Sequence, residues 1–369
     1  MPFVRFMDIC LYHKEFGYYC SASDKIGLHA DYDTSPSVHP IFATLICKQI
    51  LQMIAVLKSD HEQITLFEFG AGEGTLCQGI LDCLQKTAPD ILNRIAYIII
   101  EKSPFFQTRQ KERLTPLYPH TVLWFDQMPK DCIGIVLSNE FVDALPVHRM
   151  RISGAGSKPA LTELYVDWKD GNFLELFHPP SLPALFSHFD RLNINFKKDF
   201  QYEVNLMALD WMRAVGESLK KGFILTIDYG YPAHQLYAPA RKRGTFLCYY
   251  KHTVSEDPYQ NIGQQDMTSH VDFTALARVG EEVGLQVTGF TDQTHFLMGL
   301  GIAQEMQIAG DRMHASDAAQ KDFLAMKELM SPSKMGKTFK VLIQEKGITS
   351  STTLDGLMFR AFAKDCLIR

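Results

Sequence analysis

The chain has 369 residues, of which 46% are hydrophobic and 21% are charged, and its formal net charge is −5. This composition is ordinary for a globular enzyme, and the length suits a core domain with large insertions or two domains. The mild negative charge provides no basic footprint for nucleic acid or for an anionic membrane surface, so neither is expected as a partner.

The eight cysteines are scattered, and no Cys or Cys/His cluster has the spacing of metal ligands, so no metal site is expected. The longest apolar run, Ile41 to Leu57, is interrupted by polar residues and has helical periodicity, which predicts a packed amphipathic helix and no membrane insertion. No targeting segment is evident at the start of the chain, and we expect a cytoplasmic protein. The sequence makes no prediction of the oligomeric state.

Short, continuously apolar runs alternate with amphipathic segments along the chain. The predicted strands are 64–69, 95–100, 121–125, 134–138, 223–227, 285–290 and 339–344. The predicted helices that follow or precede them are 76–85, 104–117 and 206–219. This alternation is typical of an α/β protein whose mainly parallel sheet is covered by helices on both faces.

Two insertions interrupt this alternation. The first has a hairpin-like pattern, and the second is rich in Tyr, Pro and His. We therefore expect a lid or helical segment, a Rossmann-like core, an inserted substrate-binding subdomain and a C-terminal tail. Their expected ranges are 1–60 for the lid, 61–140 with 206–228 and 285–345 for the core, 141–205 with 229–284 for the subdomain, and 346–369 for the tail.

The first predicted strand ends in three glycines at alternate positions, and a helical pattern follows at once. Glycine permits positive φ and lets a ligand approach the backbone closely. The spacing acidic-x-G-x-G-x-G differs from the usual dinucleotide fingerprint and resembles the first motif of Rossmann-like S-adenosylmethionine (SAM) methyltransferases. A tight strand-to-helix turn that binds nothing is the alternative. The candidate cofactor-binding residues of this turn are Glu68, Gly70, Ala71, Gly72, Gly74 and Thr75.

Ligands of a doubly wound sheet lie beyond the carboxyl ends of its strands. Glu101 ends the second predicted strand, where a carboxylate can accept hydrogen bonds from both ribose hydroxyls. Asp126 and Gln127 follow the third strand and are assigned to the adenine ring. The alternatives are an exposed charge at a strand end for Glu101 and a loop cap for Asp126.

The fourth predicted strand ends in a polar segment that contains Asn139, Glu140 and Asp143. This segment lies at the mouth of the sheet, where a transferred methyl group would point, and the three residues are the catalytic candidates. A capped helix start, with Asn139 as the cap, is the alternative and is compatible with the first interpretation. The fifth strand ends in Asp228 and Tyr229, which face the same crevice.

Further polar and aromatic residues are candidates for substrate binding or for a lid. Asp266, His270 and Asp272 form a polar cluster on a distant segment, although solvated loop charges are the alternative. Tyr18 and Tyr19 are expected to close over the cofactor from the N-terminal side, with ordinary packing as the alternative. The neighbouring loop contributes the candidates Asp31, Thr34, Ser35 and Pro36.

Several sequence blocks, in one order over nearly the whole chain, resemble the MidA family, which is related to the mitochondrial complex I assembly-factor arginine methyltransferase. Departures from the family pattern occur at Ser37 and Ala43, in the expected lid. The matching blocks are Leu11-Tyr12-His13, Gly17-Tyr18-Tyr19, Asp31 to Pro36, Glu68 to Leu76, Glu101 with Ser103-Pro104, Trp124 with Asp126, Ser138 to Phe141 with Asp143 to Val147, Asp228 to Tyr231, Gly244-Thr245 with Cys248-Tyr249, and Asp266 to Phe273.

The resemblance implies a seven-stranded methyltransferase sheet with an antiparallel strand pair near the end of the chain. It also implies transfer of a methyl group from SAM to an arginine of a protein substrate, with a respiratory complex subunit as one candidate. An arginine acceptor needs carboxylates that hold its guanidinium and take up a proton, and Glu140 and Asp143 suit that role. The alternatives are a non-catalytic SAM-binding assembly factor and an NAD-dependent oxidoreductase.

Overall fold

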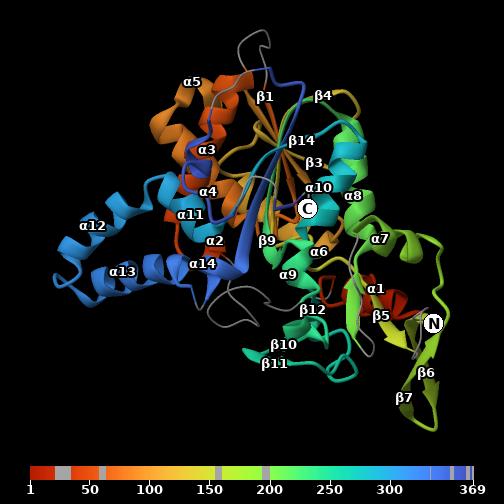
Figure 1. Ribbon diagram of the computed structural model, residues 1–369. Helices are drawn as coiled ribbons and strands as arrows, with labels where there is room; N and C mark the ends of the chain where they lie inside the picture. The colour runs from red at the N-terminus through yellow and green to blue at the C-terminus, as the bar shows by residue number, and fades with distance from the viewer. Residues whose placement is uncertain are drawn as a thin grey trace.

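A large central sheet organises the structure (Figure 1). The computed structural model describes residues 1–20, 35–57, 64–153, 160–192, 200–332, 334–349, 353–362 and 366–367. The sheet has eight strands in the order β14-β15-β9-β4-β1-β2-β3, and β13 pairs with the end of β9. Its strands are β1 (Ile64–Phe69), β2 (Ile95–Ile100), β3 (Val122–Phe125), β4 (Cys132–Asn139), β9 (Leu219–Tyr231), β13 (Val271–Asp272), β14 (Gln286–Asp292) and β15 (Phe339–Lys346).

All seven predicted core strands are present, and β9 and β15 extend beyond their predicted bounds. Strands β3, β2, β1, β4 and β9 are mutually parallel along the sheet, whereas β15 is antiparallel to both of its neighbours. The expected antiparallel pair at the end of the chain is therefore confirmed. It is not a simple hairpin, because four helices lie between β14 and β15 in the chain.

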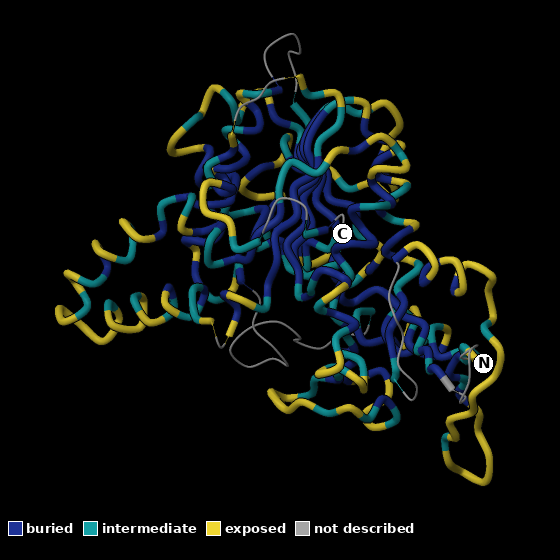
Figure 2. The backbone as a smooth tube through the Cα atoms, viewed as in Figure 1, coloured by how far each residue is buried: buried dark blue, intermediate teal, exposed yellow. Residues whose placement is uncertain are grey.

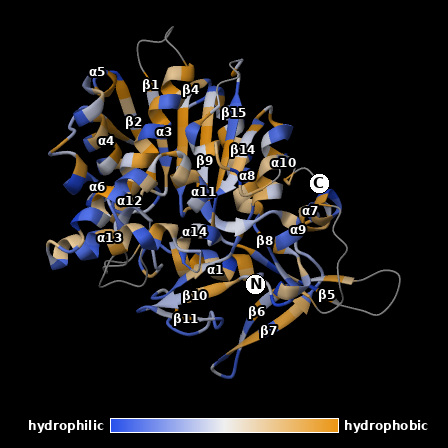
Figure 3. Cartoon of the chain, turned by 60° about the vertical axis from the view of Figure 1, so that its left-hand side comes forward, coloured by the Kyte–Doolittle hydropathy of each residue, from blue (hydrophilic) through white to orange (hydrophobic). Residues whose placement is uncertain are grey.

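Helices cover both faces of this sheet, whose strands are buried and hydrophobic (Figures 2 and 3). One face packs against α3 and α4, and the other packs against α8 and α10. The helices are α1 (Phe3–Tyr12), α2 (Ser35–Val38), α3 (Ile41–Leu57), α4 (Thr75–Thr87), α5 (Pro89–Leu92), α6 (Pro104–Leu114), α7 (Ala184–Leu192), α8 (Leu206–Ser218), α9 (Ala233–Leu236), α10 (Phe273–Glu282), α11 (Gln293–Gly299), α12 (Ile302–Arg312), α13 (Asp317–Met330) and α14 (Met335–Thr338).

Two smaller antiparallel sheets come from the insertions and lie together with α1 (Figure 1). One has the order β7-β6-β5-β8 and the other has the order β11-β10-β12. The hairpin predicted in the first insertion is confirmed as β6 and β7. The strands are β5 (His148–Ser153), β6 (Ala160–Lys169), β7 (Asn172–His178), β8 (Gln201–Val204), β10 (Leu247–Tyr250), β11 (Thr253–Ser255) and β12 (Asp266–Thr268).

Helices α12 and α13 project from the body of the molecule as a largely exposed arm (Figures 1 and 2). The sequence patterns did not predict this arm. Helix α3 is packed against the sheet, as its amphipathic pattern predicts. Among the described residues, no helix combines the length and hydrophobicity that a membrane crossing requires.

Candidate active site

The glycine turn joins β1 to α4 at the carboxyl edge of the sheet. All three glycines have left-handed backbone, with φ of 68° at Gly70, 52° at Gly72 and 79° at Gly74. A Cβ atom at Gly70 would lie 2.7 Å from a ring carbon of Phe141, so the space there is closed to larger residues. The amide of Gly74 donates to the carbonyl of Ala71 at 2.8 Å, which closes the turn immediately before α4.

Gln110 links the glycine turn to the end of β2. Its buried side-chain amide donates to the Gly72 carbonyl at 2.8 Å and to the Glu101 carboxylate at 3.2 Å. Its carbonyl oxygen accepts from the Trp124 indole at 3.0 Å. Sequence reasoning did not identify Gln110, because a glutamine inside an amphipathic helix carries no motif.

Glu101 lies where the sequence places it, at the end of β2 and beside the glycine turn. One carboxylate oxygen accepts from the Ser103 amide at 2.8 Å, and burial raises the pKa of this carboxyl above its usual value. Glu68 lies within β1 and accepts from the Tyr97 hydroxyl at 2.7 Å. Burial raises the pKa of Glu68 to about 7, although that hydrogen bond opposes the effect. Glu68 is therefore buried within the sheet next to the glycine turn, where it bonds to Tyr97.

The remaining cofactor candidates differ in exposure. Asp126 and Gln127 are exposed after β3. Ala71 is buried, and the Thr75 hydroxyl accepts from Arg113 at 3.1 Å at the start of α4. The assignment of Asp126 and Gln127 to the adenine ring stays a prediction.

The segment after β4 is a turn and not the helix start that was considered as an alternative. Glu140 has a left-handed backbone, with φ of 51°, which is incompatible with a helical first turn. Asp228, near the end of β9, accepts the backbone amides of this turn, which a helix-capping residue would otherwise do. One of its carboxylate oxygens accepts from the amides of Phe141, Val142 and Asp143 at 2.8–3.3 Å, and the other accepts from the Tyr229 amide at 2.8 Å.

Four acidic side chains converge at this turn, and we call them the acidic cluster: Glu140, Asp143, Asp228 and Asp266. Glu140 and Asp143 follow β4, Asp228 lies in β9 and Asp266 begins β12, so residues more than a hundred positions apart meet at one edge of the sheet. In the described part of the chain, no ion pair joins Glu140, Asp143 or Asp228 to a basic side chain.

Burial raises the pKa values of Glu140, Asp143 and Asp228, and repulsion between carboxylates adds to the rise for Glu140 and Asp143. The pKa of Glu140 rises to about 8, chiefly by burial and further by the charge of Asp228. Burial, and then the charges of Asp228, Asp266 and Glu140, raise the pKa of Asp143 well above its usual value. Burial raises the pKa of Asp228 to about 7, although its four backbone hydrogen bonds oppose this rise. The cluster is therefore suited to receive a cation.

The lid candidates Tyr18 and Tyr19 have different surroundings. The Tyr19 hydroxyl donates to Asp266 at 2.6 Å, and the Tyr19 carbonyl accepts from the Ser103 hydroxyl at 2.6 Å. Tyr19 thus spans from the end of β2 to the acidic cluster. Tyr18 is buried in the core around α1. This agrees with ordinary packing, which was the alternative to closure over the cofactor.

The lid candidates are only partly described. The Ser35 amide donates to the Glu140 carboxylate at 3.0 Å, and Pro36 follows it in α2. Ser35 therefore contacts the acidic cluster directly. Asp31 and Thr34 lie outside the described residues.

The other two members of the distant polar cluster have different surroundings. Asp272 caps α10 by accepting from the Ala275 amide at 2.9 Å, and it also accepts from the Tyr237 hydroxyl at 3.0 Å. The ring of His270 lies parallel to that of Tyr229, with 6.4 Å between centroids, and its buried Nδ1 has no hydrogen-bond partner. Of the three residues, only Asp266 joins the acidic cluster. Asp266 is buried, and Asp272 is held by the two hydrogen bonds just described, so the alternative of a loop of solvated charges is wrong for both.

The residues present fit a bound SAM. Left-handed glycines expose backbone at the end of β1, and Glu101 lies across the Gln110 bridge from it. The buried Oδ1 of Asn139 and Oγ of Ser138, at the end of β4, have no hydrogen-bond partner. Buried polar atoms without partners are rare in native proteins, and they are expected where a ligand binds.

Comparison with known proteins identifies relatives that are named methyltransferases. The model of the S-adenosyl-L-methionine-dependent methyltransferase family Methyltransf_28 matches residues 45–291, more than half of the chain. The chain is 25% identical to the Drosophila melanogaster protein arginine methyltransferase NDUFAF7 homolog, covering 95% of this chain and 83% of that protein. It is 26% identical to Homo sapiens NDUFAF7, covering 91% and 78% respectively.

Two solved structures from Burkholderia thailandensis have the same fold over nearly the whole chain. One is a COG1565 superfamily member bound to S-adenosyl-homocysteine, with a TM-score of 0.84, 29% identity and coverage of 96% of this chain and 90% of that chain. The other is a native structure from the same superfamily, with a TM-score of 0.82, 30% identity and coverage of 98% and 91%. The chain belongs to the MidA-like family of SAM-dependent methyltransferases.

Proposed function

We propose that this methyltransferase acts on the side chain of an arginine in a protein substrate. The observation that carries the proposal is the acidic cluster, whose carboxyl groups are largely buried at the turn that packs against Gly70 through Phe141. The relatives that are named protein arginine methyltransferases support it, at 25–26% identity. A respiratory complex subunit is the substrate that we would test first, because of the relationship to the complex I assembly factor.

Arginine is a difficult acceptor because its guanidinium stays protonated and its lone pair is delocalised. Bound SAM supplies an electrophilic methyl group. The protein must hold the acceptor nitrogen in line, exclude water and accept the proton that leaves. Carboxylates bind a guanidinium through two parallel hydrogen bonds, which fixes the plane of the acceptor.

The geometry suggests a division of these roles. Glu140 is anchored by hydrogen bonds from Ser35 and Asn139, both at 3.0 Å, and is suited to hold the guanidinium. Burial and neighbouring carboxylates raise the pKa of Asp143 well above its usual value, and the charge of a bound guanidinium would favour its carboxylate form, which is then suited to take up the proton. Asp228 fixes the turn that carries both residues through its backbone hydrogen bonds.

The cofactor site and the acidic cluster also separate this proposal from the alternatives. The family match and the acidic-x-G-x-G-x-G turn support SAM over NAD. An assembly factor without activity would have no use for four desolvated acids beside the cofactor, because burying such groups lowers stability.

The test is incubation of cell extract with SAM carrying a labelled methyl group, followed by mass spectrometry of the labelled protein. We expect methylated arginine with the wild-type enzyme and none with Gly72→Val, which blocks the cofactor turn. Asp143→Asn should retain SAM binding by calorimetry while turnover falls by about 10²-fold or more.

Three results would contradict the proposal. Label on another residue type or on a small molecule would exclude protein arginine as the acceptor. Unchanged turnover of Asp143→Asn would remove Asp143 from catalysis. SAM binding without methylation of any protein in the extract would favour the assembly-factor alternative.

A further inference from the structure

Three basic side chains surround one tyrosine ring, that of Tyr231, at the end of β9. The guanidinium carbon of Arg241 lies 3.9 Å from the ring centroid, and Nζ of Lys340 lies 4.8 Å from it. The imidazole of His270 has its centroid 5.4 Å from that of Tyr231. We call Arg241, His270 and Lys340 the basic cluster.

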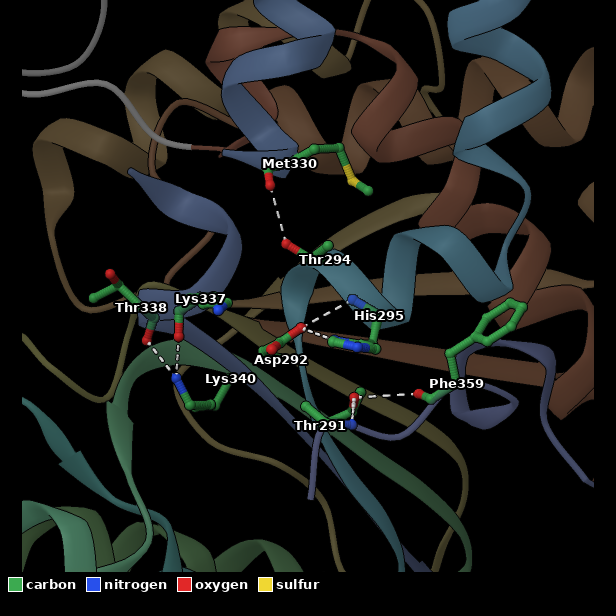
Figure 4. A network of polar contacts seen from close by, with 10 residues as sticks. Thr291, Asp292, Thr294, His295, Met330, Lys337, Thr338, Lys340 and Phe359 are labelled. Atoms are coloured by element: carbon green, nitrogen blue, oxygen red, sulfur yellow. Dashed lines mark hydrogen bonds and ion pairs between the residues drawn. The ribbon is translucent and has the colours of Figure 1, made fainter. Parts of the chain in front are cut away.

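Asp292 is the anion nearest to the basic cluster, and its charge acts on Lys340 without forming an ion pair with it. In the described part of the chain, no ion pair involves Lys340 or Arg241. Asp292 is directly opposite Lys340 on β14, but its carboxylate accepts from the His295 ring at 2.6 Å and caps α11. Lys340 instead donates to the backbone carbonyls of Lys337 and Thr338, as Figure 4 shows.

Burial makes this arrangement costly. Lys340 is only 2% exposed, and burial lowers its pKa to about 8; the charge of Asp292 opposes this shift, and the charge of Arg241 adds to it. The buried Nδ1 of His270 has no partner, and burial together with Arg241 and Lys340 lowers the pKa of His270 to about 4. Two cations and an unpartnered imidazole in one place would be stabilised by an incoming anion.

The position of the basic cluster points to the substrate. Lys340 is directly opposite Asp228 across the β15–β9 pair, and His270 packs on the ring of Tyr229. The basic cluster is therefore one strand away from the acidic cluster, at the same edge of the sheet. Arg241 and His270 are only partly buried, so an extended ligand can reach them.

We propose that the basic cluster is an oxyanion subsite that binds a carboxylate of the polypeptide substrate while the acidic cluster binds its target arginine. This inference rests on the proposed function and narrows the substrate class to sequences that carry an acidic residue near the arginine. Arg241, whose Nη1 also donates to the Gln235 carbonyl at 2.6 Å, would donate its other N–H groups to the carboxylate, and Lys340 supplies a point charge. A free phosphate or a phosphorylated side chain shares this chemistry, so the test must distinguish these sources.

The first arm of the test uses simple anions and needs no turnover. The enzyme saturated with S-adenosyl-homocysteine is titrated with sodium acetate or sodium phosphate at constant ionic strength, and the NMR signal of the His270 ring is followed. His270→Gln identifies that signal. We expect a saturable shift that Arg241→Gln abolishes. Arg243→Gln is the matched control, because Arg243 is exposed and pairs with Glu256, and it should behave as wild type.

The second arm measures binding of labelled arginine peptides by fluorescence anisotropy. Peptide pairs carry Asp or Asn at each position around the arginine, and a third series carries phosphoserine. We expect the Asp peptide to bind about tenfold more tightly than the Asn peptide at one position, as one charge-assisted contact would give. Arg241→Gln and Lys340→Met should remove that preference, whereas Arg243→Gln should retain it.

The outcomes separate this inference from the proposed function. Arginine peptides that bind without any acidic preference would overturn the subsite and leave the proposed function intact. A preference for phosphoserine over Asp would overturn its assignment to a carboxylate. Peptides that bind no better with arginine than with citrulline would instead contradict the proposed function, while a His270 shift with acetate would still support an oxyanion site. Absence of that shift, or its persistence in Arg241→Gln, would overturn the subsite.

Discussion

Replacing Glu140 with glutamine should change how the stability of the protein depends on pH. One carboxylate oxygen of Glu140 accepts both the Ser35 amide and the Asn139 side chain, each at 3.0 Å. The carbonyl oxygen of a glutamine can accept the same two hydrogen bonds. The substitution therefore removes the charge of Glu140 and little else.

The size of the effect follows from the pKa. A rise of the Glu140 pKa from 4.5 to about 8 corresponds to about 5 kcal/mol in the free energy of unfolding. The native state holds this proton more tightly than the unfolded state, so the contribution is complete below about pH 4.5 and is lost as the pH rises to about 8. Glu140 is partly exposed, and because solvent screens its interactions we expect about 2–3 kcal/mol.

Urea unfolding at pH 5 and at pH 9, followed by tryptophan fluorescence, measures this difference. Glu140→Gln should match wild type at pH 5 and be more stable by about 2–3 kcal/mol at pH 9, where the wild-type carboxylate is charged. Glu112→Gln, at an exposed position on α6, is the control and should not change the pH profile. A difference between Glu140→Gln and wild type that is independent of pH would refute the electrostatic account of the acidic cluster.

Three further substitutions test the site. Gly70→Ala should weaken SAM binding and lower stability by about 2–3 kcal/mol, because its Cβ would collide with Phe141 in a left-handed conformation; calorimetry with wild-type affinity would contradict this. Gln110→Ala removes the bridge from Gly72 to Glu101, and SAM affinity measured by calorimetry should fall about tenfold. Asp228 accepts backbone amides on both carboxylate oxygens, so Asp228→Asn, with one accepting oxygen, leaves an amide without a partner, and Tm by calorimetry should fall by several degrees.

The core of the fold could be predicted from the sequence because its signals are local. Each central strand is a short apolar run, and the helix after the glycine turn buries Leu76, Ile80 and Leu84 at helical spacing. The arm of α12 and α13 was not predicted, and few of its residues are buried. The turn after β4 was ambiguous because capping residues and site residues have the same chemistry there.

The members of the acidic cluster were individually identified, but their meeting could not be derived from spacing. Asp266 reaches Asp143 only because β12 belongs to an insertion that returns to the edge of the main sheet. Lys340 lay within a predicted strand, where the apolar pattern hides one basic residue. In both cases the neighbours of the residue depend on the order of the strands in the sheet, which distant parts of the chain determine together.

The two clusters together explain why this edge of the sheet has opposite charges that do not neutralise each other. Asp228 and Lys340 are opposite each other on neighbouring strands, yet Asp228 accepts four backbone amides and Lys340 donates to two backbone carbonyls. Backbone groups thus hold the two side chains apart at a cost in stability, since a direct ion pair would relieve both desolvated charges. A ligand with its own cation and anion in a fixed arrangement would restore that free energy on binding. An arginine and a carboxylate on one polypeptide form such a ligand, whereas an isolated arginine would satisfy only the acidic half.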